Sequence, residues 1–303
     1  MELRTEDGTI LRGVHMTPPG DGPHPLVVLG HGWGAVKEMF LHEVAETIVG
    51  AGVACLLYDH RCLGESDGEP RGDLDPWTQI NDARDVITHA RGLPGVDPDR
   101  IGVWGSSYAG GQAIVLGAVD RRVRCVVAQV PTISGWRTTQ RRFPFDGLAQ
   151  LRARFDADRA ARLRGEPPAT VAIAPGLDLA AARSGEEDRP VEAGNDGARW
   201  YDAIAGRRLA RWTNEVTLRS LERYAEYEPG SYIERVAPTP LLVICMREDT
   251  ITPTDEILGA YGRAREPKRL LLLDGGHYDV YGTSRATAAG AAAAWFAEHL
   301  VSA

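Results

Sequence analysis

Residues 101–111 constrain the fold of this chain more than any other stretch, and they read IGVWGSSYAGG. An apolar run of strand length ends in glycine, serine and other small residues, and a helix-compatible segment follows. A strand-to-helix turn this tight needs small residues two positions to either side of the serine that it presents. Gly105 and Ala109 meet this requirement around Ser107, in the pattern G-x-S-x-A, whereas the corresponding neighbours of Ser106 are large. We therefore predict a nucleophile elbow that exposes the Ser107 hydroxyl beyond the end of a strand.

Two apolar runs near the C-terminus also end in polar residues. Residues 240–246 lead into Glu248 and Asp249, and residues 269–274 lead into a loop that contains His277. Because an open α/β sheet gathers its site beyond the carboxyl ends of its strands, we expect these side chains to lie near Ser107. A serine hydroxyl needs a base to become a nucleophile, and a carboxylate can orient the histidine that serves as this base. Ser107, Asp249 and His277 are therefore the candidate catalytic triad.

The acid and the base each have a competing interpretation. Glu248 is the other candidate acid; we prefer Asp249 because it lies four residues before Pro253, at the turn where the next helix should begin. Asp249 could instead cap that helix, and His277 could be an ordinary loop histidine. Two glycines directly before His277 indicate a tight, closely packed loop, which favours the functional interpretation.

Acyl transfer also needs hydrogen-bond donors for the negative charge that develops on the carbonyl oxygen. In this type of site one donor is the N–H of the residue after the nucleophile, which is Tyr108 here, and the other comes from the loop after an early strand. That loop is residues 30–34, which read GHGWG. The backbone N–H groups of Trp33 and Tyr108 are therefore the predicted oxyanion hole.

Strand-like and helix-like segments alternate through most of the chain. The predicted strands cover residues 2–5, 10–16, 26–30, 53–58, 100–104, 123–127, 240–246 and 269–274, and helices fit 37–49, 76–90 and the segment from the elbow to about 117. This alternation predicts an α/β fold with a doubly wound, mostly parallel sheet, to which the first hairpin adds an antiparallel edge.

The alternation stops between residues 131 and 237. Helix-like segments at 145–163, 195–209 and 214–227 are joined there by stretches rich in proline and glycine. A long insertion on the side of the sheet that carries the site is usually functional. We therefore predict a core domain made of residues 1–130 and 238–303, with a helical cap at 131–237.

Several of these motifs together resemble the α/β-hydrolase superfamily over nearly the whole chain. They are residues 31–34, the turn at 59–66, the elbow, residues 249–253 and residues 276–277. The chain departs from the family at Cys62, where the turn pattern D-x-R-G-x-G-x-S usually has glycine, although that turn supports the fold more than the chemistry. Residues 214–222, 227–230 and 237–242 resemble the branch of dienelactone hydrolases and X-prolyl-peptidase-like proteins, which includes fungal polyketide transferases. This resemblance implies an acyl-enzyme mechanism shared by hydrolases and acyltransferases, and it leaves the substrate open.

The predicted cap also carries candidate substrate-binding residues. Aromatic side chains in a cap either line a pocket or form the cap's own small core. Trp136 and Phe143 are the strongest pocket candidates, because they follow directly after the end of a sheet strand. Arginines are dense between residues 137 and 164. Such a run forms a solvated helix face or docks an anionic acyl carrier or a CoA-like thioester.

Composition narrows the classes of protein and of binding partner that fit this chain. The chain has 303 residues, of which 43% are hydrophobic and 25% charged, as is ordinary for a globular protein. Its net charge of −8 argues against a nucleic-acid partner. Without a membrane-length apolar run or a leader-like N-terminus, we expect a cytoplasmic protein with no membrane partner. The four cysteines lack metal-ligand spacing, so we expect no metal and no cofactor, and a homodimer is compatible with the sequence.

These observations predict a serine hydrolase that cleaves a small-molecule ester, thioester or lactone through an acyl-enzyme. An acyltransferase that moves a polyketide-like acyl group to an alcohol, or a hydrolase of C–C bonds, would use the same triad. A ligand-binding receptor with this fold is less well supported, because such receptors usually lose a triad residue and this chain has all three. A peptidase is disfavoured because no site for a peptide N-terminus is recognisable.

Overall fold

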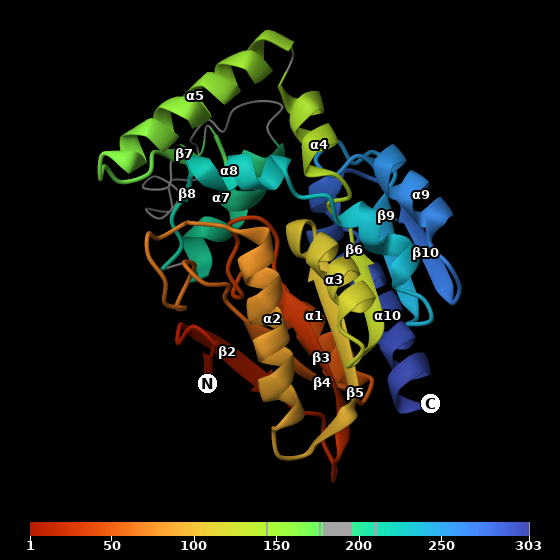
Figure 1. Ribbon diagram of the computed structural model, residues 1–303. Coiled ribbons are helices and arrows are strands. Elements are labelled where there is room, and N and C mark those ends of the chain that lie inside the picture. The colour runs from red at the N-terminus through yellow and green to blue at the C-terminus, as the bar shows by residue number, and fades with distance from the viewer. Residues whose placement is uncertain (144, 176, 178–195, 209–210, 303) are drawn as a thin grey trace.

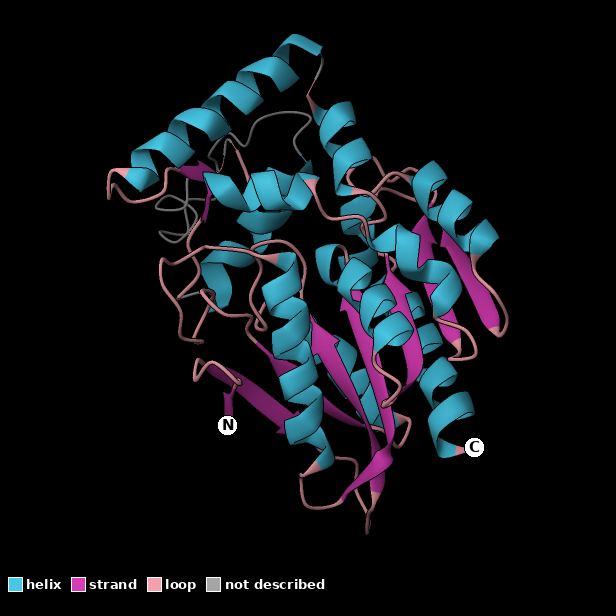
Figure 2. Cartoon of the chain, viewed as in Figure 1, coloured by secondary structure: helices cyan, strands magenta, loops and turns pink. Residues whose placement is uncertain are grey.

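The computed structural model describes residues 1–143, 145–175, 177, 196–208 and 211–302, and an eight-stranded sheet lies at its centre (Figures 1 and 2). The strand order is β1-β2-β4-β3-β5-β6-β9-β10. From β4 to β10 all neighbours are parallel, whereas β2 is antiparallel to both β1 and β4. The strands are β1 (Glu2–Arg4), β2 (Ile10–Met16), β3 (His24–Gly30), β4 (Ala54–Tyr58), β5 (Val96–Ser106), β6 (Val123–Gln129), β9 (Leu241–Met246) and β10 (Lys268–Leu273). The predicted mostly parallel sheet with an antiparallel edge is confirmed.

Helices cover both faces of this sheet (Figure 1). One face packs against α1 (Leu41–Gly50) and α10 (Arg285–Phe296), which continues into η3 (Ala297–Val301). The other packs against α2 (Pro76–Arg91), α3 (Tyr108–Val119), η1 (Pro229–Arg235) and α9 (Thr254–Arg263). Alternate residues of β3 enter the two cores: Val27 and Leu29 face one, and Leu26 and Val28 face the other. A strand buried on both faces explains why this segment is a continuous apolar run.

The chain between β6 and β9 lies over the carboxyl ends of the parallel strands (Figure 1). Before η1, which packs on a face of the sheet, its described elements are α4 (Gly135–Arg142), α5 (Phe145–Leu163), β7 (Thr170–Ala172), α7 (Asp196–Arg208), β8 (Glu215–Thr217) and α8 (Leu218–Ala225). Residues 178–195 of the predicted cap lie outside the described residues. The helix expected at 214–227 is shorter than predicted, because Val216 pairs with Val171 of β7 and the helix begins only at Leu218.

The turn after β4 explains the one departure from the family pattern. Cys62 has a φ of 65°, in the left-handed region that favours glycine. Its side chain is buried beside Gly68, where a larger residue would collide with the Cys62 sulfur. The cysteine therefore keeps the left-handed backbone conformation for which related proteins usually have glycine at this position.

Across the described ranges, no helix has both the length and the apolar character needed to cross a bilayer.

Candidate active site

Ser107 stands at the junction of β5 and α3, in the backbone conformation of a nucleophile elbow. Its φ of 57° and ψ of −116° are costly for a residue with a Cβ, by about 1–3 kcal/mol. Two hydrogen bonds hold this conformation: Ser107 N–H donates to the Gln129 carbonyl (2.8 Å), and Thr132 N–H donates to the Ser107 carbonyl (2.9 Å). The neighbouring strand β6 and the start of the insertion thus fix the serine in place.

Small residues around the elbow are a steric requirement. A Cβ on Gly105 would collide with the carbonyl oxygen of Ala109, and a Cβ on Gly32 would lie 3.4 Å from the Cβ of Ser107. The neighbouring serine is placed differently. Ser106 is fully buried and its Oγ lies 3.1 Å from Gln129 Nε2, whereas Ser107 lines the cavity described below.

His277 and Asp249 meet in a buried hydrogen bond beside this serine. His277 Nδ1 lies 2.7 Å from Asp249 Oδ2, and both side chains are almost fully buried. His277 begins η2 (His277–Tyr281), in the loop after β10, and Asp249 follows β9. A proton on Nδ1 that is donated to Asp249 leaves Nε2 free to accept another. His277 and Ser107 line the same cavity.

The Asp249 carboxylate has two separate tasks. Oδ1 accepts hydrogen bonds from the N–H groups of Ile251 and Thr252, both at 2.8 Å, while Oδ2 faces His277. Asp249 therefore orders the turn before α9 without capping the helix itself, whose N-cap is Pro253. Glu248 is exposed and lines the cavity, and no described group connects its carboxylate to His277.

Trp33 and Tyr108, the predicted oxyanion donors, line the same cavity as Ser107. Among the described residues, neither N–H donates to a protein acceptor. The insertion holds the loop that carries Trp33: Trp212 Nε1 donates to the Gly34 carbonyl (2.7 Å), and the Tyr201 hydroxyl donates to the Trp33 carbonyl (3.2 Å). The rings of Trp212 and Tyr201 stack nearly parallel, with centroids 5.1 Å apart.

A buried histidine, His31, holds the same loop through hydrogen bonds. His31 Nδ1 lies 3.2 Å from the Gly32 carbonyl, and its Nε2 accepts the N–H of His60 (3.2 Å). Burial lowers the pKa of His31 and, more strongly, that of His60. Both rings are therefore neutral at pH 7 and act as fixed supports.

The cavity in front of Ser107 has a volume of about 580 Å³, and eight aromatic side chains are among the residues that line it. The core contributes Trp33, Phe40, Tyr108, Tyr278 and Tyr281, and the insertion contributes Trp200, Tyr201 and Tyr224. Trp200 packs at 5.4 Å from Tyr278 and 5.2 Å from Tyr281, measured between ring centroids. Sequence reasoning missed most of these residues, because they come from five separate segments of the chain.

The two pocket residues predicted from sequence are wrong. Neither Trp136 nor Phe143 lines the cavity. Trp136 is 36% exposed on α4, with the guanidinium of Arg152 over its ring at 5.3 Å. Phe143 packs against Leu151, Phe155 and Leu218 in the insertion's own small core. Proximity to a strand end did not specify which side chains reach the cavity, because Trp136 contacts Arg152 at the surface and Phe143 packs within the insertion.

Most arginines of the predicted run are engaged within the chain. The pairs are Arg137–Glu256, Arg141–Asp255, Arg159–Glu222, Arg162–Asp158 and Arg164–Glu166. These ion pairs neutralise much of the positive charge that could attract an anionic carrier. Arg142 is the arginine of this run that lines the cavity.

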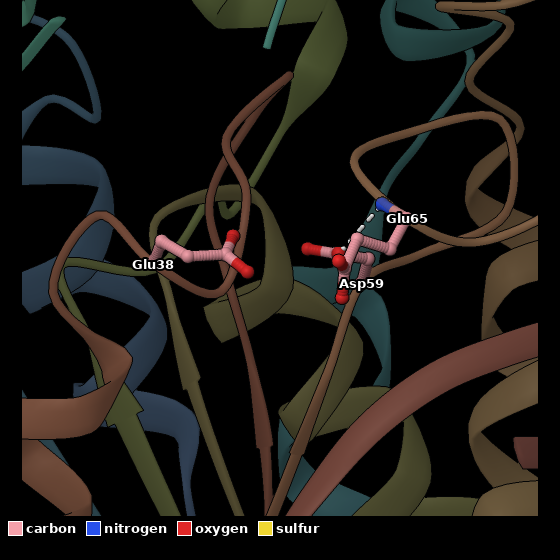
Figure 3. A group of neighbouring side chains, drawn as sticks. All are labelled: Glu38, Asp59 and Glu65. Atoms are coloured by element: carbon pink, nitrogen blue, oxygen red, sulfur yellow. Dashed lines mark hydrogen bonds between the residues drawn. The ribbon is translucent and has the colours of Figure 1, made fainter. Parts of the chain in front are cut away.

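Three carboxylates near the active-site loop, Glu38, Asp59 and Glu65, point toward one another as in a cation site (Figure 3). The cation is supplied by the chain, because Lys37 Nζ lies 2.7 Å from Glu38, 2.7 Å from Asp59 and 2.9 Å from Glu65. Burial alone would lower the Lys37 pKa, but the three carboxylates outweigh it and raise that pKa. We therefore interpret the cluster as a structural ion-pair network.

A family model described as X-Pro dipeptidyl-peptidase (S15 family) matches residues 7–279. The chain belongs to this family. It is 33% identical to a thiohydrolase from Eupenicillium brefeldianum over 92% of this chain and 87% of the relative. It is also 30% identical to a polyketide transferase from a Penicillium species, over 93% of this chain and 90% of the relative.

Solved structures agree with this assignment. An α/β hydrolase from a Penicillium species superposes with a TM-score of 0.81 at 26% identity, over 99% of this chain and 98% of the other. A hypothetical protein from Pseudomonas aeruginosa gives a TM-score of 0.83 at 25% identity, over 99% and 92%. The predicted α/β-hydrolase fold and its branch are confirmed, and the chain is an enzyme of this class.

The corrected cavity lining gives a prediction about substrate size. Trp200→Ala should lower kcat/KM for a bulky aromatic acyl ester more than for an acetyl ester. The reason is that one lost apolar contact reduces the discrimination between two substrates by about 1–3 kcal/mol. Trp136→Ala, outside the cavity, is the matched control and should leave the ratio unchanged. The measurement is kcat/KM for both esters in each variant, with melting temperatures to exclude unfolding. An equal loss for both esters in folded Trp200→Ala would remove Trp200 from the binding surface.

Proposed function

We propose that this enzyme cleaves an ester, thioester or lactone through an acyl-enzyme formed on Ser107, with His277 as general base and Asp249 as its orienting acid. The observation that carries the proposal is the buried 2.7 Å contact between His277 Nδ1 and Asp249 Oδ2, with His277 lining the same cavity as Ser107. In this proposal residues 1–130 and 238–303 supply the chemistry, and residues 131–237 form a cap that shapes the cavity.

The reaction would take two steps. Ser107 Oγ attacks the substrate carbonyl while His277 Nε2 takes its proton, and the N–H groups of Trp33 and Tyr108 stabilise the tetrahedral oxyanion. The bond to the leaving group then breaks, and His277 returns the proton to the departing oxygen or sulfur. A water molecule, deprotonated by His277, releases the acid and restores Ser107.

A thioester is the best-supported substrate class. The thiohydrolase relatives match this chain over most of its length, and a thiolate is a good leaving group for the first step. The aromatic lining suits an unsaturated or aromatic acyl group. Arg142 and Glu248 at the same cavity could contact polar ends of the acyl group or its carrier.

Acyl transfer is the second candidate, because several relatives are named polyketide transferases. The first step is the same, and an alcohol replaces water in the second. Water and the alcohol compete for the acyl-enzyme, and water reacts more often the better it reaches the cavity. A transferase should therefore pass its acyl group to added alcohol more than to water. A peptidase, a C–C bond hydrolase and a binding-only receptor have weaker support.

A substrate panel tests this proposal. Wild-type protein should hydrolyse N-acetylcysteamine thioesters and nitrophenyl esters of graded acyl size, while Ser107→Ala should lose essentially all turnover. Alanyl-prolyl nitroanilide should be a poor substrate, and adding alcohol acceptors reports transfer through the ratio of ester to acid. Equal turnover by wild type and Ser107→Ala would overturn the proposal, and preference for the prolyl substrate would redirect it to a peptidase.

The assignment of the acid gives a second prediction. Asp249→Asn should lower kcat by orders of magnitude, because an amide favours the wrong tautomer of His277; in a related triad the loss is about 10⁴-fold. Glu248→Gln, one residue earlier and exposed, is the matched control and should lose little. Steady-state kinetics on a nitrophenyl ester check both variants. A larger loss in folded Glu248→Gln would make Glu248 the acid.

A further inference from the structure

Tyr281 lies beside the candidate nucleophile and has no part in the mechanism above. It follows His277 by four residues, at the end of the same short helix η2, and it is buried while still lining the cavity. Its hydroxyl lies 2.7 Å from Ser106 Oγ, and the nearby Ser107 hydroxyl offsets a small part of the rise that burial causes in the Tyr281 pKa. The phenol hydroxyl is therefore bonded to Ser106 and lies on the same cavity as Ser107.

The surrounding donors determine where the Tyr281 proton points. Gln129 Nε2 donates to Ser106 Oγ (3.1 Å), so the Ser106 oxygen already accepts one hydrogen bond. Ser106 is fully buried, and its own proton needs an acceptor. Within the described part of the chain, the Tyr281 oxygen is the acceptor in reach. Ser106 therefore donates to Tyr281, which leaves the Tyr281 proton free to point at Ser107.

We propose that Tyr281 is a further catalytic residue, which donates a hydrogen bond to Ser107 Oγ through a relay that runs from Gln129 to Ser106 to Tyr281. This inference rests on the proposed function, because it takes Ser107 as the nucleophile. The donated bond fixes the serine rotamer that directs the Ser107 proton to His277. It also stabilises the negative charge that Oγ acquires while it attacks, and again when it leaves the acyl group.

No proton moves along this relay. Burial raises the pKa of Tyr281, so its hydroxyl stays protonated throughout the cycle. The bonds that form and break are those of the two-step reaction, with His277 alone carrying the proton. Tyr281 thus acts on the same oxygen in both steps, whereas Trp33 and Tyr108 act on the carbonyl oxygen.

The test compares Tyr281→Phe and Ser106→Ala with Tyr261→Phe, which removes a hydroxyl from α9, away from the cavity. Two quantities are measured: the second-order rate of labelling by a fluorophosphonate, which reports the nucleophilicity of Ser107 Oγ, and the separate values of kcat and KM on a nitrophenyl ester. We expect Tyr281→Phe to lower the labelling rate and kcat by about 10- to 100-fold with KM little changed, somewhat less than removal of an oxyanion donor. Ser106→Ala should lower both to a smaller extent, and Tyr261→Phe should match wild type.

Each result bears on the inference directly. A Tyr281→Phe protein with the wild-type melting temperature and an undiminished labelling rate overturns it, while an inactive Ser107→Ala in the same assay leaves the proposed function standing. Activity retained by Ser107→Ala would instead remove the proposed function. If Tyr281→Phe does not fold, Ser106→Ala decides: a slower labelling rate in folded protein supports the relay, and an unchanged rate contradicts it.

Discussion

The left-handed backbone at Ser107 is the constraint on which the rest of the site depends. A serine at a φ of 57° is stable only because β5, β6 and α3 hold it from three sides. Gly105 admits the Ala109 carbonyl, and Gly110 lies against the start of the insertion at Pro131. This packing starts α3 at Tyr108, so the first free N–H of the helix lies next to the nucleophile. The strain and the donor therefore have the same structural origin.

In the proposed mechanism, the insertion supports the chemistry indirectly. Trp212 and Tyr201 hold the carbonyl groups of Gly34 and Trp33, and so fix the loop that presents the Trp33 N–H. Tyr201 also lines the cavity, between Trp200 and Tyr278. In the proposed mechanism, substrate contacts and the position of an oxyanion donor are thus coupled through one aromatic cluster. Changes in the insertion can alter turnover as well as substrate choice.

The sequence was sufficient wherever function imposed a local pattern. The tight turn around Ser107 requires small neighbours, and the strand ends place Asp249 and His277 beyond one edge of the sheet, so the fold and the meeting of Asp249 with His277 could be predicted. The catalytic roles of these three residues stay a prediction. The preference for Asp249 over Glu248 as the acid stays a prediction, which agrees with the contact between Asp249 and His277. The dual use of the Asp249 carboxylate could not be predicted, because it depends on which way each oxygen points.

The cavity could not be predicted in the same way. Its lining comes from loops and helices far apart in the chain, and side-chain direction decides which aromatics take part: Trp200 faces Ser107's cavity, whereas Trp136 lies on the surface. The role inferred for Tyr281 depends on a chain of hydrogen bonds from Gln129 through Ser106. Only the folded arrangement brings those three residues together.

The most direct test of the account is to trap the acyl-enzyme. Wild-type protein is mixed with an excess of a nitrophenyl acyl ester, quenched in acid within milliseconds, and digested for peptide mass mapping. The account predicts one acyl group per chain, on the peptide that contains the elbow and localised by fragmentation to Ser107, with no adduct in Ser107→Ala. An acyl group on Ser106 or elsewhere, or an undiminished adduct in Ser107→Ala, would contradict it.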